Sequence, residues 1–227
     1  MTNYNQYEKI GLDFIKGQKD YFSNRTDHAR KFIKSRLPDL NGKNILDAGC
    51  GHGIDIITYE KLGAKEVYGI DNSKFMIDEA KKIAKKPENI LIGNMNSIPL
   101  EDKSIDVITG RFSLHYLSEI DKAYLEFARL LKDGGVLVII THHPLLSFVQ
   151  TGSENYINKN KVKMQLYNNK VSIEFPHHTL KEFFSDAFFE LFYLDYFDEE
   201  SLEKAEYANA QKIPGYIAFK AIRRNKK

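Results

Sequence analysis

The sequence predicts an α/β fold: a doubly wound, mostly parallel sheet of seven strands with helices on both faces and a small β-hairpin inserted after the fifth strand. Short apolar segments rich in valine and isoleucine alternate with longer amphipathic segments up to about residue 141. That alternation is typical of a parallel sheet that is buried on both faces. It ends near residue 144, and two more strand-like segments lie close to the C-terminus.

The first elements follow from the spacing of apolar residues. Helical spacing predicts a helix within residues 21–40, which Pro38 ends. Residues 43–49 and 65–71 have the composition of short buried strands. Between these two strands, residues 53–63 predict a helix that ends at a glycine.

The middle of the chain continues the same order. Asn72 or Ser73 is the expected cap of a helix over residues 72–86, whose solvent face is crowded with lysines. Residues 89–94 and 105–110 predict the third and fourth strands.

The strongest helical pattern covers residues 118–135. Ser118 is its expected cap, an apolar stripe marks its buried face, and Gly134 is its expected end. Residues 136–141 then predict the fifth strand.

After the fifth strand the pattern changes to that of a hairpin. Residues 162–175 predict two strands that turn at Asn168–Asn169, because asparagine tolerates the left-handed backbone of tight turns. A short helix near residues 180–186 and strands over residues 189–197 and 215–223 follow.

Composition limits the choice of partner and compartment. Among the 227 residues, 33 lysines and arginines stand against 31 acidic residues, so the net charge is only +2 and a nucleic-acid partner is not expected. Cys50 is the single cysteine, which indicates a reducing, cytoplasmic setting without an internal disulfide. The apolar runs are too short to cross a bilayer, so no membrane association is expected. We expect a monomer or a homodimer.

A run of alternating glycines follows the first predicted strand. Gly49, Gly51 and Gly53 have the spacing Gly-x-Gly-x-Gly. A Walker phosphate loop would need a lysine after the last glycine, and a dinucleotide fingerprint would need Gly-x-Gly-x-x-Gly. Asp47 precedes the run and would repel a pyrophosphate, whereas it would attract a cation. Asp71 ends the second predicted strand, where a carboxylate accepts both hydroxyls of a ribose. A ligand with a ribose, a positive charge and no phosphate fits, and S-adenosylmethionine meets all three conditions.

At this point the chain resembles the class I S-adenosylmethionine-dependent methyltransferases, with a Rossmann-like fold, and in particular their small-molecule, quinone-biosynthesis-like ("type 11") branch. The resemblance covers roughly residues 40–141 and rests on four motifs in order: "ILDAGCGHG", "VYGIDNS", "IGNMNSIPLEDKSIDVITGRFSLHYL" and "ARLLKDGGVLVIIT". It implies a transferase that moves a methyl group to a small-molecule acceptor and leaves S-adenosylhomocysteine.

The resemblance also implies positions for the cofactor. Asp47, Gly49, Cys50 and Gly51 would surround its methionine end, and Asp71 would hold the ribose. The remaining expected cofactor residues are Asn72 or Met76 at the adenine border, Asn94 and Met95 at the adenine ring, and Arg111 between cofactor and acceptor. Asn94 departs from the family, which has an aspartate there, yet its amide oxygen still accepts a hydrogen bond.

Four segments follow from this resemblance. Residues 1–40 would form an N-terminal helical lid, and residues 41–143 would form the S-adenosylmethionine-binding core. Residues 144–180 would form a substrate lid, and residues 181–227 would complete the sheet. The aromatic residues expected to form the lid over an apolar or aromatic acceptor are Tyr4, Tyr7, Tyr21, Phe22, Tyr156 and Tyr167.

Histidine is the most suitable general base if the acceptor is a hydroxyl. His115 is expected near the methyl end of the cofactor, and one of His143 or His178 is expected to face the acceptor. Packing or capping roles remain open for all three. No familiar metal-binding spacing accompanies the paired histidines, so no metal is expected.

Two other functions remain open. A methyltransferase acting on RNA or protein would be expected to carry a basic face or an added domain. A non-catalytic or nicotinamide-binding protein would need a broken first motif or the dinucleotide fingerprint. The amino-methylating DNA enzymes are excluded because their Asn/Asp-Pro-Pro-Tyr/Phe motif is absent after the fourth strand. The sequence leaves the acceptor atom open.

Overall fold

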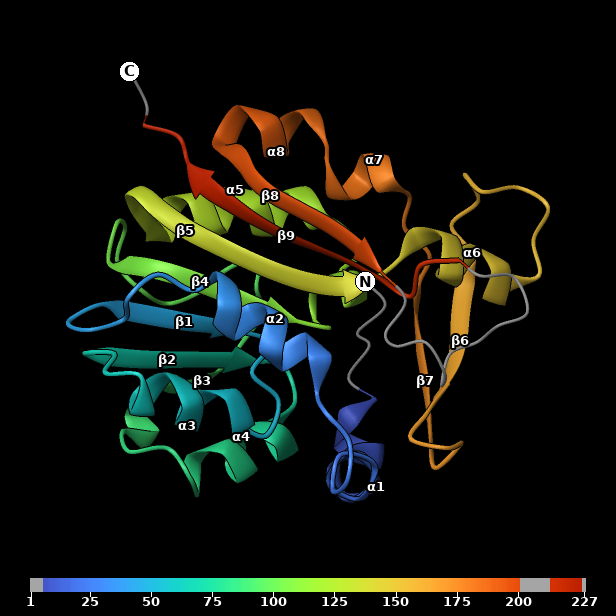
Figure 1. Ribbon diagram of the computed structural model, residues 1–227, viewed down its shortest axis with the longest axis horizontal. Helices are drawn as coiled ribbons and strands as arrows, with labels where there is room; N and C mark the ends of the chain where they lie inside the picture. Colours follow the sequence, from blue (N-terminus) through green and yellow to red (C-terminus); the bar gives the residue numbers. More distant parts are fainter. Residues whose placement is uncertain (1–5, 201–212, 226–227) are drawn as a thin grey trace.

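A computed structural model describes residues 6–200 and 213–225 of the chain. Its main feature is one seven-stranded sheet in the order β3-β2-β1-β4-β5-β9-β8 (Figure 1). Strands β1 to β5 pair in parallel, and β9 and β8 are antiparallel additions. The strands of this sheet are β1 (Asn44–Ala48), β2 (Glu66–Asp71), β3 (Ile90–Ile92), β4 (Ile105–Arg111), β5 (Leu131–His142), β8 (Phe192–Glu200) and β9 (Tyr216–Arg223). The predicted doubly wound, mostly parallel sheet is confirmed.

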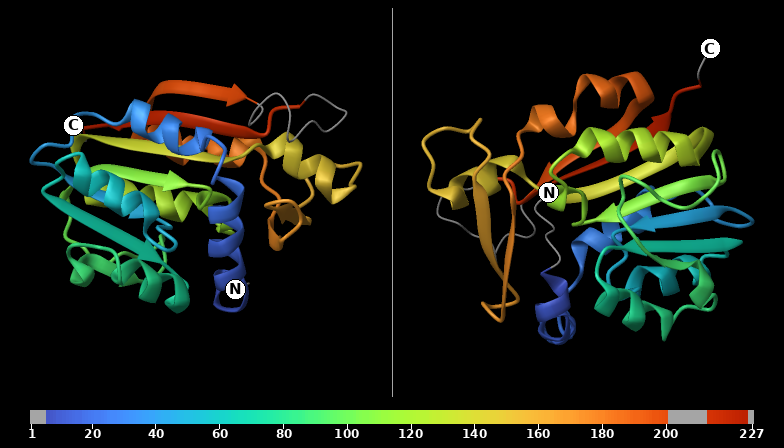
Figure 2. Two further views of the ribbon diagram at one scale, coloured as in Figure 1. Left: turned by 60° about the horizontal axis from the view of Figure 1, so that its bottom comes forward. Right: turned by 180° about the vertical axis from the view of Figure 1, so that it is seen from behind.

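Helices cover both faces of the sheet because neighbouring strand residues point to opposite sides. Ile45 packs with the first helical layer and Leu46 with the second, and both are fully buried. The first layer contains α2 (His28–Arg36), α3 (Ile54–Lys61) and α4 (Lys74–Lys81). The second layer contains α5 (Ile120–Leu130), α7 (Leu180–Phe183) and α8 (Asp186–Leu191), which lie in front of the sheet in the right-hand view of Figure 2.

A separate hairpin stands beside the sheet at its carboxyl edge (Figure 1). It consists of β6 (Lys161–Leu166) and β7 (Val171–Pro176). Tyr167, Asn168 and Asn169 form its turn with φ angles of 53°, 57° and 62°, so the predicted hairpin and its left-handed turn are confirmed. Helix α6 (Pro144–Thr151) packs against β6.

Two helices precede β1, whereas the sequence predicted only one, within residues 21–40. Helix α1 (Tyr7–Tyr21) lies between α4 and the hairpin (Figure 2, left). Asp27 begins α2 by accepting a hydrogen bond from the Arg30 amide at 2.9 Å. Within the described residues, two short 3₁₀ turns complete the elements, η1 (Pro87–Asn89) and η2 (Leu114–Tyr116).

The strongest predicted helix, over residues 118–135, ends earlier in the structure than the sequence predicts. Helix α5 ends at Leu130, and Gly134 does not terminate it. Leu131 pairs with Ile105 of β4, so the strand starts where the helix was expected to continue. Gly134, at a φ of 73°, lies in the irregular stretch before pairing resumes at Val136. Ser118 is not the cap either, because Glu119 occupies the cap position without a side-chain hydrogen bond.

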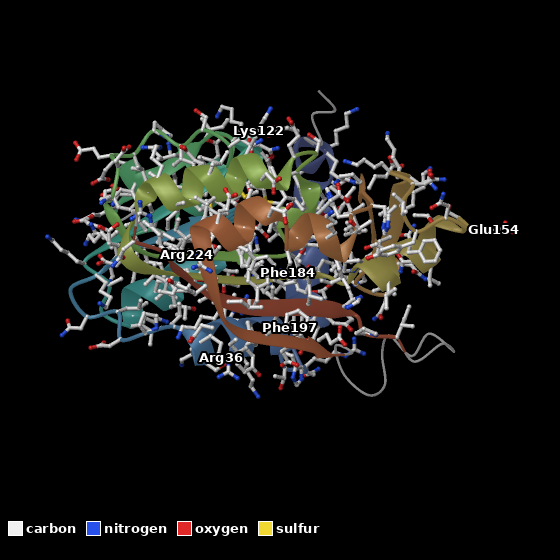
Figure 3. The ribbon with its side chains drawn as sticks, turned by 90° about the horizontal axis from the view of Figure 1, so that it is seen from above. Arg36, Lys122, Glu154, Phe184, Phe197 and Arg224 are labelled. Carbon is white, nitrogen blue, oxygen red and sulfur yellow. The ribbon has the colours of Figure 1, made fainter. Side chains whose placement is uncertain are left out.

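The predicted strand over residues 189–197 is displaced toward the C-terminus. Helix α8 takes up the first three of those residues, since the Ser185 hydroxyl caps it by accepting from the Phe188 amide at 3.1 Å. Strand β8 then forms the outer edge of the sheet. Figure 3 shows Phe184 and Phe197 side by side over this edge, with ring centroids 5.6 Å apart.

Candidate active site

A cavity of about 510 Å³ opens at the carboxyl edge of the parallel strands. Small-molecule sites typically enclose roughly 300–1,000 Å³, and in doubly wound sheets they lie at this edge. One side of the cavity is lined by the glycine loop and by the ends of β2 and β4. The opposite side is lined by α1, α6 and the hairpin. The cavity therefore joins a polar half over the sheet to an aromatic half under the hairpin.

The glycine loop runs over the end of β2 in a backbone conformation that glycine alone adopts easily. Gly49, Gly51 and Gly53 have φ angles of 79°, 51° and 83°. The amides of Gly49 and Cys50 both donate to the Ile70 carbonyl, at 2.8 and 3.0 Å. A Cβ on Gly49 would lie 2.3 Å from the Cβ of Ser113, whereas a Cβ on Gly51 would meet no protein atom within 4 Å. Gly51 thus borders open cavity space, as a cradle for a ligand requires.

Asp71 links the glycine loop to the start of α4. Its carboxylate accepts from the Gly51 amide at 3.0 Å and from the Ser73 amide at 2.9 Å. Burial raises the pKa of Asp71 above its usual value. Each carboxylate oxygen has a second lone pair, so the group can still accept hydroxyl donors from a ligand in the cavity.

Asp47 is a buried carboxylate that forms no ion pair among the described residues, although the charge of Arg111 partly offsets the rise in its pKa. It is 2% exposed, and its one side-chain hydrogen bond comes from the Thr109 hydroxyl at 3.3 Å. Burial, and then the negative charge of Asp55, raise the pKa of Asp47 to about 8. A positively charged ligand group would relieve this, so the residues fit the α-ammonium of S-adenosylmethionine.

Arg111 lines the cavity from the end of β4 but is held by acidic side chains. Its Nε donates to Asp55 at 2.6 Å, and its Nη1 lies 3.7 Å from Asp27. Arg30 donates to the other oxygen of Asp55 at 2.7 Å. Burial alone would lower the pKa of Arg111, yet Asp55 and Asp27 raise it above its ordinary value. The guanidinium therefore stays charged and fixed in the cavity wall.

Asp27 and Asp55 line the cavity, and Arg30 pairs with Asp55, although none of the three was predicted as a site residue. Asp27 carries a helix-cap signal, and Asp55 lies in the first turn of the helix after the glycine loop. Both features have a structural explanation in the sequence alone. Their proximity to Arg111 depends on the pairing of β1 with β4 and could not be read from spacing.

The residues expected around the adenine all line the cavity: Asn72, Met76, Asn94 and Met95. Asn94 is exposed, and its amide oxygen accepts from the Asn96 amide at 2.9 Å. Met76 is 1% exposed and Ser73 caps its helix, which decides between the two predicted caps. Cys50 also lines the cavity, and burial raises its thiol pKa well above the usual range, so the thiol stays protonated.

The aromatic half of the cavity brings α1 against the hairpin and η2. The Tyr7 and Tyr116 hydroxyls are 2.7 Å apart, and burial raises the pKa of both phenols, so both keep their protons. Tyr21, Phe22 and Tyr167, three of the predicted lid residues, also line the cavity. Tyr156 does not: its hydroxyl accepts from the Leu180 amide at 2.8 Å. Tyr4 lies outside the described residues.

The expectation that His143 or His178 faces the acceptor is not met in the structure, because neither lines the cavity. The two ring nitrogens of His143 are engaged: Nδ1 accepts from the Leu145 amide at 3.0 Å, and Nε2 lies 3.1 Å from Glu199. His178 packs against Phe183, with Glu182 at 3.8 Å. Both histidines serve as anchors behind the wall.

His115 lies one layer behind the cavity. It is 2% exposed, and its Nδ1 is 3.0 Å from the Thr141 hydroxyl. Burial, then the nearby His142 and His178, lower the pKa of His115 well below its usual value. The histidines that do line the cavity are His28, His52 and His142, none of which was predicted to face the acceptor. The signal was available, since His142 ends β5 at the ligand-binding edge.

Glu8 fixes the helix that closes the cavity. Its Oε1 accepts from the Ser73 hydroxyl at 2.8 Å and from the Phe75 amide at 3.1 Å. These hydrogen bonds lower the pKa of Glu8, so it is ionised at neutral pH. We expect Glu8→Ala to raise amide hydrogen exchange across residues 7–21 several-fold, because α1 loses its attachment to α4. Hydrogen-exchange mass spectrometry measures this. Lys9→Ala, at the neighbouring exposed position, is the matched control, and equal exchange in both variants would contradict the attachment.

Within the residues that the structure describes, no helix is long and apolar enough to cross a membrane. The same residues contain no group of three or more histidine, cysteine, aspartate or glutamate side chains that could hold a metal ion.

Comparisons with known proteins agree with this geometry. Residues 46–139 match the family described as "Methyltransferase domain". A demethylmenaquinone methyltransferase of Lactococcus lactis subsp. lactis is 33% identical over 159 residues, which cover 66% of this chain and 62% of that protein. The uncharacterized methyltransferase YcgJ of Bacillus subtilis is 31% identical over 119 residues, or 51% of this chain and 47% of that protein. The chain therefore spans about half to three fifths of the length of these relatives.

The solved structures give the same fold. The crystal structure of an S-adenosylmethionine-dependent methyltransferase from Mesorhizobium loti matches with a TM-score of 0.70 at 21% identity, covering 84% of this chain and 95% of that one. The chain therefore has the fold of this methyltransferase structure. The matched residues 46–139 contain Asp47, the glycine loop and Asp71.

Proposed function

We propose that this protein transfers the methyl group of S-adenosylmethionine to a small, largely apolar or aromatic acceptor by in-line displacement. The observation that carries the proposal is that one cavity joins the glycine loop to the aromatic residues under the hairpin. A methyl donor on one side and an acceptor on the other would then share one enclosed space. In this proposal α1 and residues 144–180 act as lids over the core of residues 41–143, whereas α2, from the predicted lid of residues 1–40, packs on the sheet.

The polar half of the cavity supports the cofactor assignment. Asp47 offers a buried carboxylate to the α-ammonium, and Gly51 leaves room for the amino-acid part of the cofactor. Asp71 offers carboxylate oxygens to the ribose, as its place at the end of β2 suggests. Met95 and Asn94 offer an apolar face and an amide oxygen to the adenine.

The bound cofactor supplies a methyl group that is already activated by the sulfonium. The protein then has to align the acceptor with that group and to exclude water. Tyr7, Phe14 and Tyr167 cover the cavity from α1 and the hairpin turn, and this cover supports exclusion of water. Arg111 stays bound to Asp55, so it offers little to an anionic acceptor, which favours a neutral one.

Calorimetric titration tests the cofactor. We expect S-adenosylmethionine and S-adenosylhomocysteine to bind and a nicotinamide dinucleotide not to bind. Asp71→Ala should weaken both sulfur nucleosides roughly 10- to 100-fold, since hydrogen bonds to a charged group contribute about 1.5–3 kcal/mol.

Asp71 also holds the Gly51 and Ser73 amides, so a second variant is needed to separate binding from loop structure. Asp71→Asn keeps one acceptor oxygen and should fall between the wild type and Asp71→Ala. Thermal unfolding of each variant reports whether the loop change alters the fold. Preferred binding of the dinucleotide would overturn the proposed cofactor site.

A further inference from the structure

His142 lines the cavity at the end of β5, whereas the other two lining histidines, His28 and His52, come from α2 and the glycine loop. Three aromatic rings hold its imidazole. Phe175 stacks on it with centroids 5.3 Å apart and an interplanar angle of 6°, and Phe112 lies 4.9 Å away on a tilted plane. His115 meets it edge-on at 4.7 Å. The ring is therefore fixed in orientation by its neighbours.

Phe112 reaches this position through an unusual backbone. Its φ is 52°, in the left-handed region that a bulky residue rarely adopts. Its amide donates to the Ile140 carbonyl at 2.8 Å, which ties the turn after β4 to β5. Strained residues of this kind concentrate at ligand sites, where the surrounding structure holds them. The strain here keeps a phenyl ring against His142.

The imidazole of His142 lacks a hydrogen-bond partner. Its Nδ1 is buried with no donor or acceptor among the described residues. Nε2 is not among the buried atoms and makes no hydrogen bond within the described residues, so it is the nitrogen that a ligand in the cavity can reach. A polar atom that lines a cavity without a protein partner indicates a ligand partner. Burial also lowers the pKa of His142 to about 4, so the ring is neutral at pH 7 and has one acceptor nitrogen.

The surroundings of His142 in the cavity are mostly apolar. Side chains from α6 and the hairpin form one cluster there, and Leu146, Met164 and Ile173 of that cluster line the cavity. The phenols of Tyr7 and Tyr116 already face each other, and the Gln18 amide donates to the Tyr167 hydroxyl at 3.3 Å. Among the described residues, His142 is thus an unpartnered polar side chain in this apolar part of the wall.

We propose that His142 selects and orients the methyl acceptor by accepting a hydrogen bond from a neutral O–H or N–H group on an otherwise apolar molecule. This inference rests on the proposed methyltransferase function and adds the acceptor class to it. His142 acts as a fixed hydrogen-bond acceptor, and no proton transfer to it is required.

The test uses a pair of probes that differ in one hydrogen-bond donor. 2-Naphthol carries a hydroxyl, and 2-methoxynaphthalene has the same rings with that donor removed. Binding of each probe is measured by calorimetry to protein saturated with S-adenosylhomocysteine, for the wild type, His142→Gln and His142→Leu. We expect the wild type to bind 2-naphthol about tenfold more tightly than its methyl ether. His142→Leu should bind both probes equally, and His142→Gln, which keeps an acceptor oxygen, should retain part of the preference.

Each other outcome counts against the inference. Equal binding of the two probes by the wild type, or binding of neither, overturns it. A preference for 2-naphthol that persists in His142→Leu overturns it as well, because another group would then accept the hydrogen bond from the hydroxyl. Saturation of the wild type by S-adenosylhomocysteine is the separate check on the proposed function: if it fails, the methyltransferase proposal fails first.

Discussion

Gly49→Ala is expected to destabilise the protein severely. The new Cβ would sit 2.3 Å from the Cβ of Ser113, and the φ of 79° is unfavourable for alanine. Left-handed backbone costs roughly 1–2 kcal/mol and overpacking typically 1–3 kcal/mol, so we expect a loss of about 2–5 kcal/mol. For a chain of this length, the midpoint of thermal unfolding should fall by roughly 5–15 °C. Calorimetric unfolding without ligand measures this.

Ser113 has little freedom to move away. Its hydroxyl donates to the Ala48 carbonyl at 2.6 Å, and its side chain is buried. The same hydrogen bond holds the turn after β4 against the start of the glycine loop. Accommodation of a methyl group at Gly49 would therefore break a buried hydrogen bond as well.

Gly51→Ala is the matched control, two residues along the same loop. Its φ of 51° brings the left-handed strain, but its Cβ would meet no protein atom within 4 Å. We expect this variant to lose only about 1–2 kcal/mol of stability. Its methyl group would enter the space assigned to the cofactor, and overpacking of about 1–3 kcal/mol corresponds to five- to 150-fold weaker binding of S-adenosylhomocysteine. Equal unfolding midpoints in the two variants would contradict the assigned geometry.

This pair of glycines illustrates how far the sequence could be read. The spacing of the glycines, the preceding Asp47 and the later Asp71 predicted a loop that approaches a ligand closely. The different neighbours of Gly49 and Gly51 could not be predicted, because Ser113 comes from a turn more than sixty residues away. Local spacing reports what the backbone needs, whereas side-chain neighbours depend on strand pairing.

The choice between the histidines and the position of the α5–β5 boundary likewise could not be predicted from local sequence. His142 and His143 are adjacent at the end of β5, and alternation puts their side chains on opposite sides. Choosing between them required the register of β5 against β9, in which His142 pairs with Tyr216. Likewise, Gly134 has the composition of a helix end, yet pairing of Leu131 with Ile105 ended the helix earlier. In both cases a tertiary contact decided between two locally acceptable structures.

Cofactor affinity is expected to rise steeply with pH through Asp47. In the ligand-free protein, burial raises the pKa of Asp47 to about 8, so the group is mostly protonated at pH 6. Binding an α-ammonium beside it favours the carboxylate and releases a proton. The fraction of protein that is ready to bind therefore increases up to tenfold per pH unit until about pH 8. Because the α-ammonium itself titrates near pH 8, we expect a net gain of roughly 20- to 50-fold between pH 6 and 8.

Calorimetry with S-adenosylhomocysteine measures both parts of this prediction. Dissociation constants at pH 6, 7 and 8 give the slope, and buffers of different ionisation enthalpy give the number of protons released, which should approach one at pH 6. Asp71 also lines the cavity, and its pKa is raised as well. A variant is therefore needed to assign the pH dependence of binding to Asp47. Asp47→Asn should bind the ligand weakly and with little pH dependence, whereas an unchanged slope in this variant would assign the proton to another group.

The stability of the ligand-free protein should change with pH in the opposite sense. The folded-state pKa of Asp47 is raised, so the folded protein holds a proton that the unfolded chain releases near pH 4. The contribution of Asp47 to stability is therefore present below about pH 4 and is lost as the pH rises toward 8. Asp47→Asn lacks this titration. Its unfolding midpoint should therefore rise relative to that of the wild type as the pH increases across the same range. Saturating S-adenosylhomocysteine should reverse the difference at pH 8, because it supplies the cation that the wild-type carboxylate lacks.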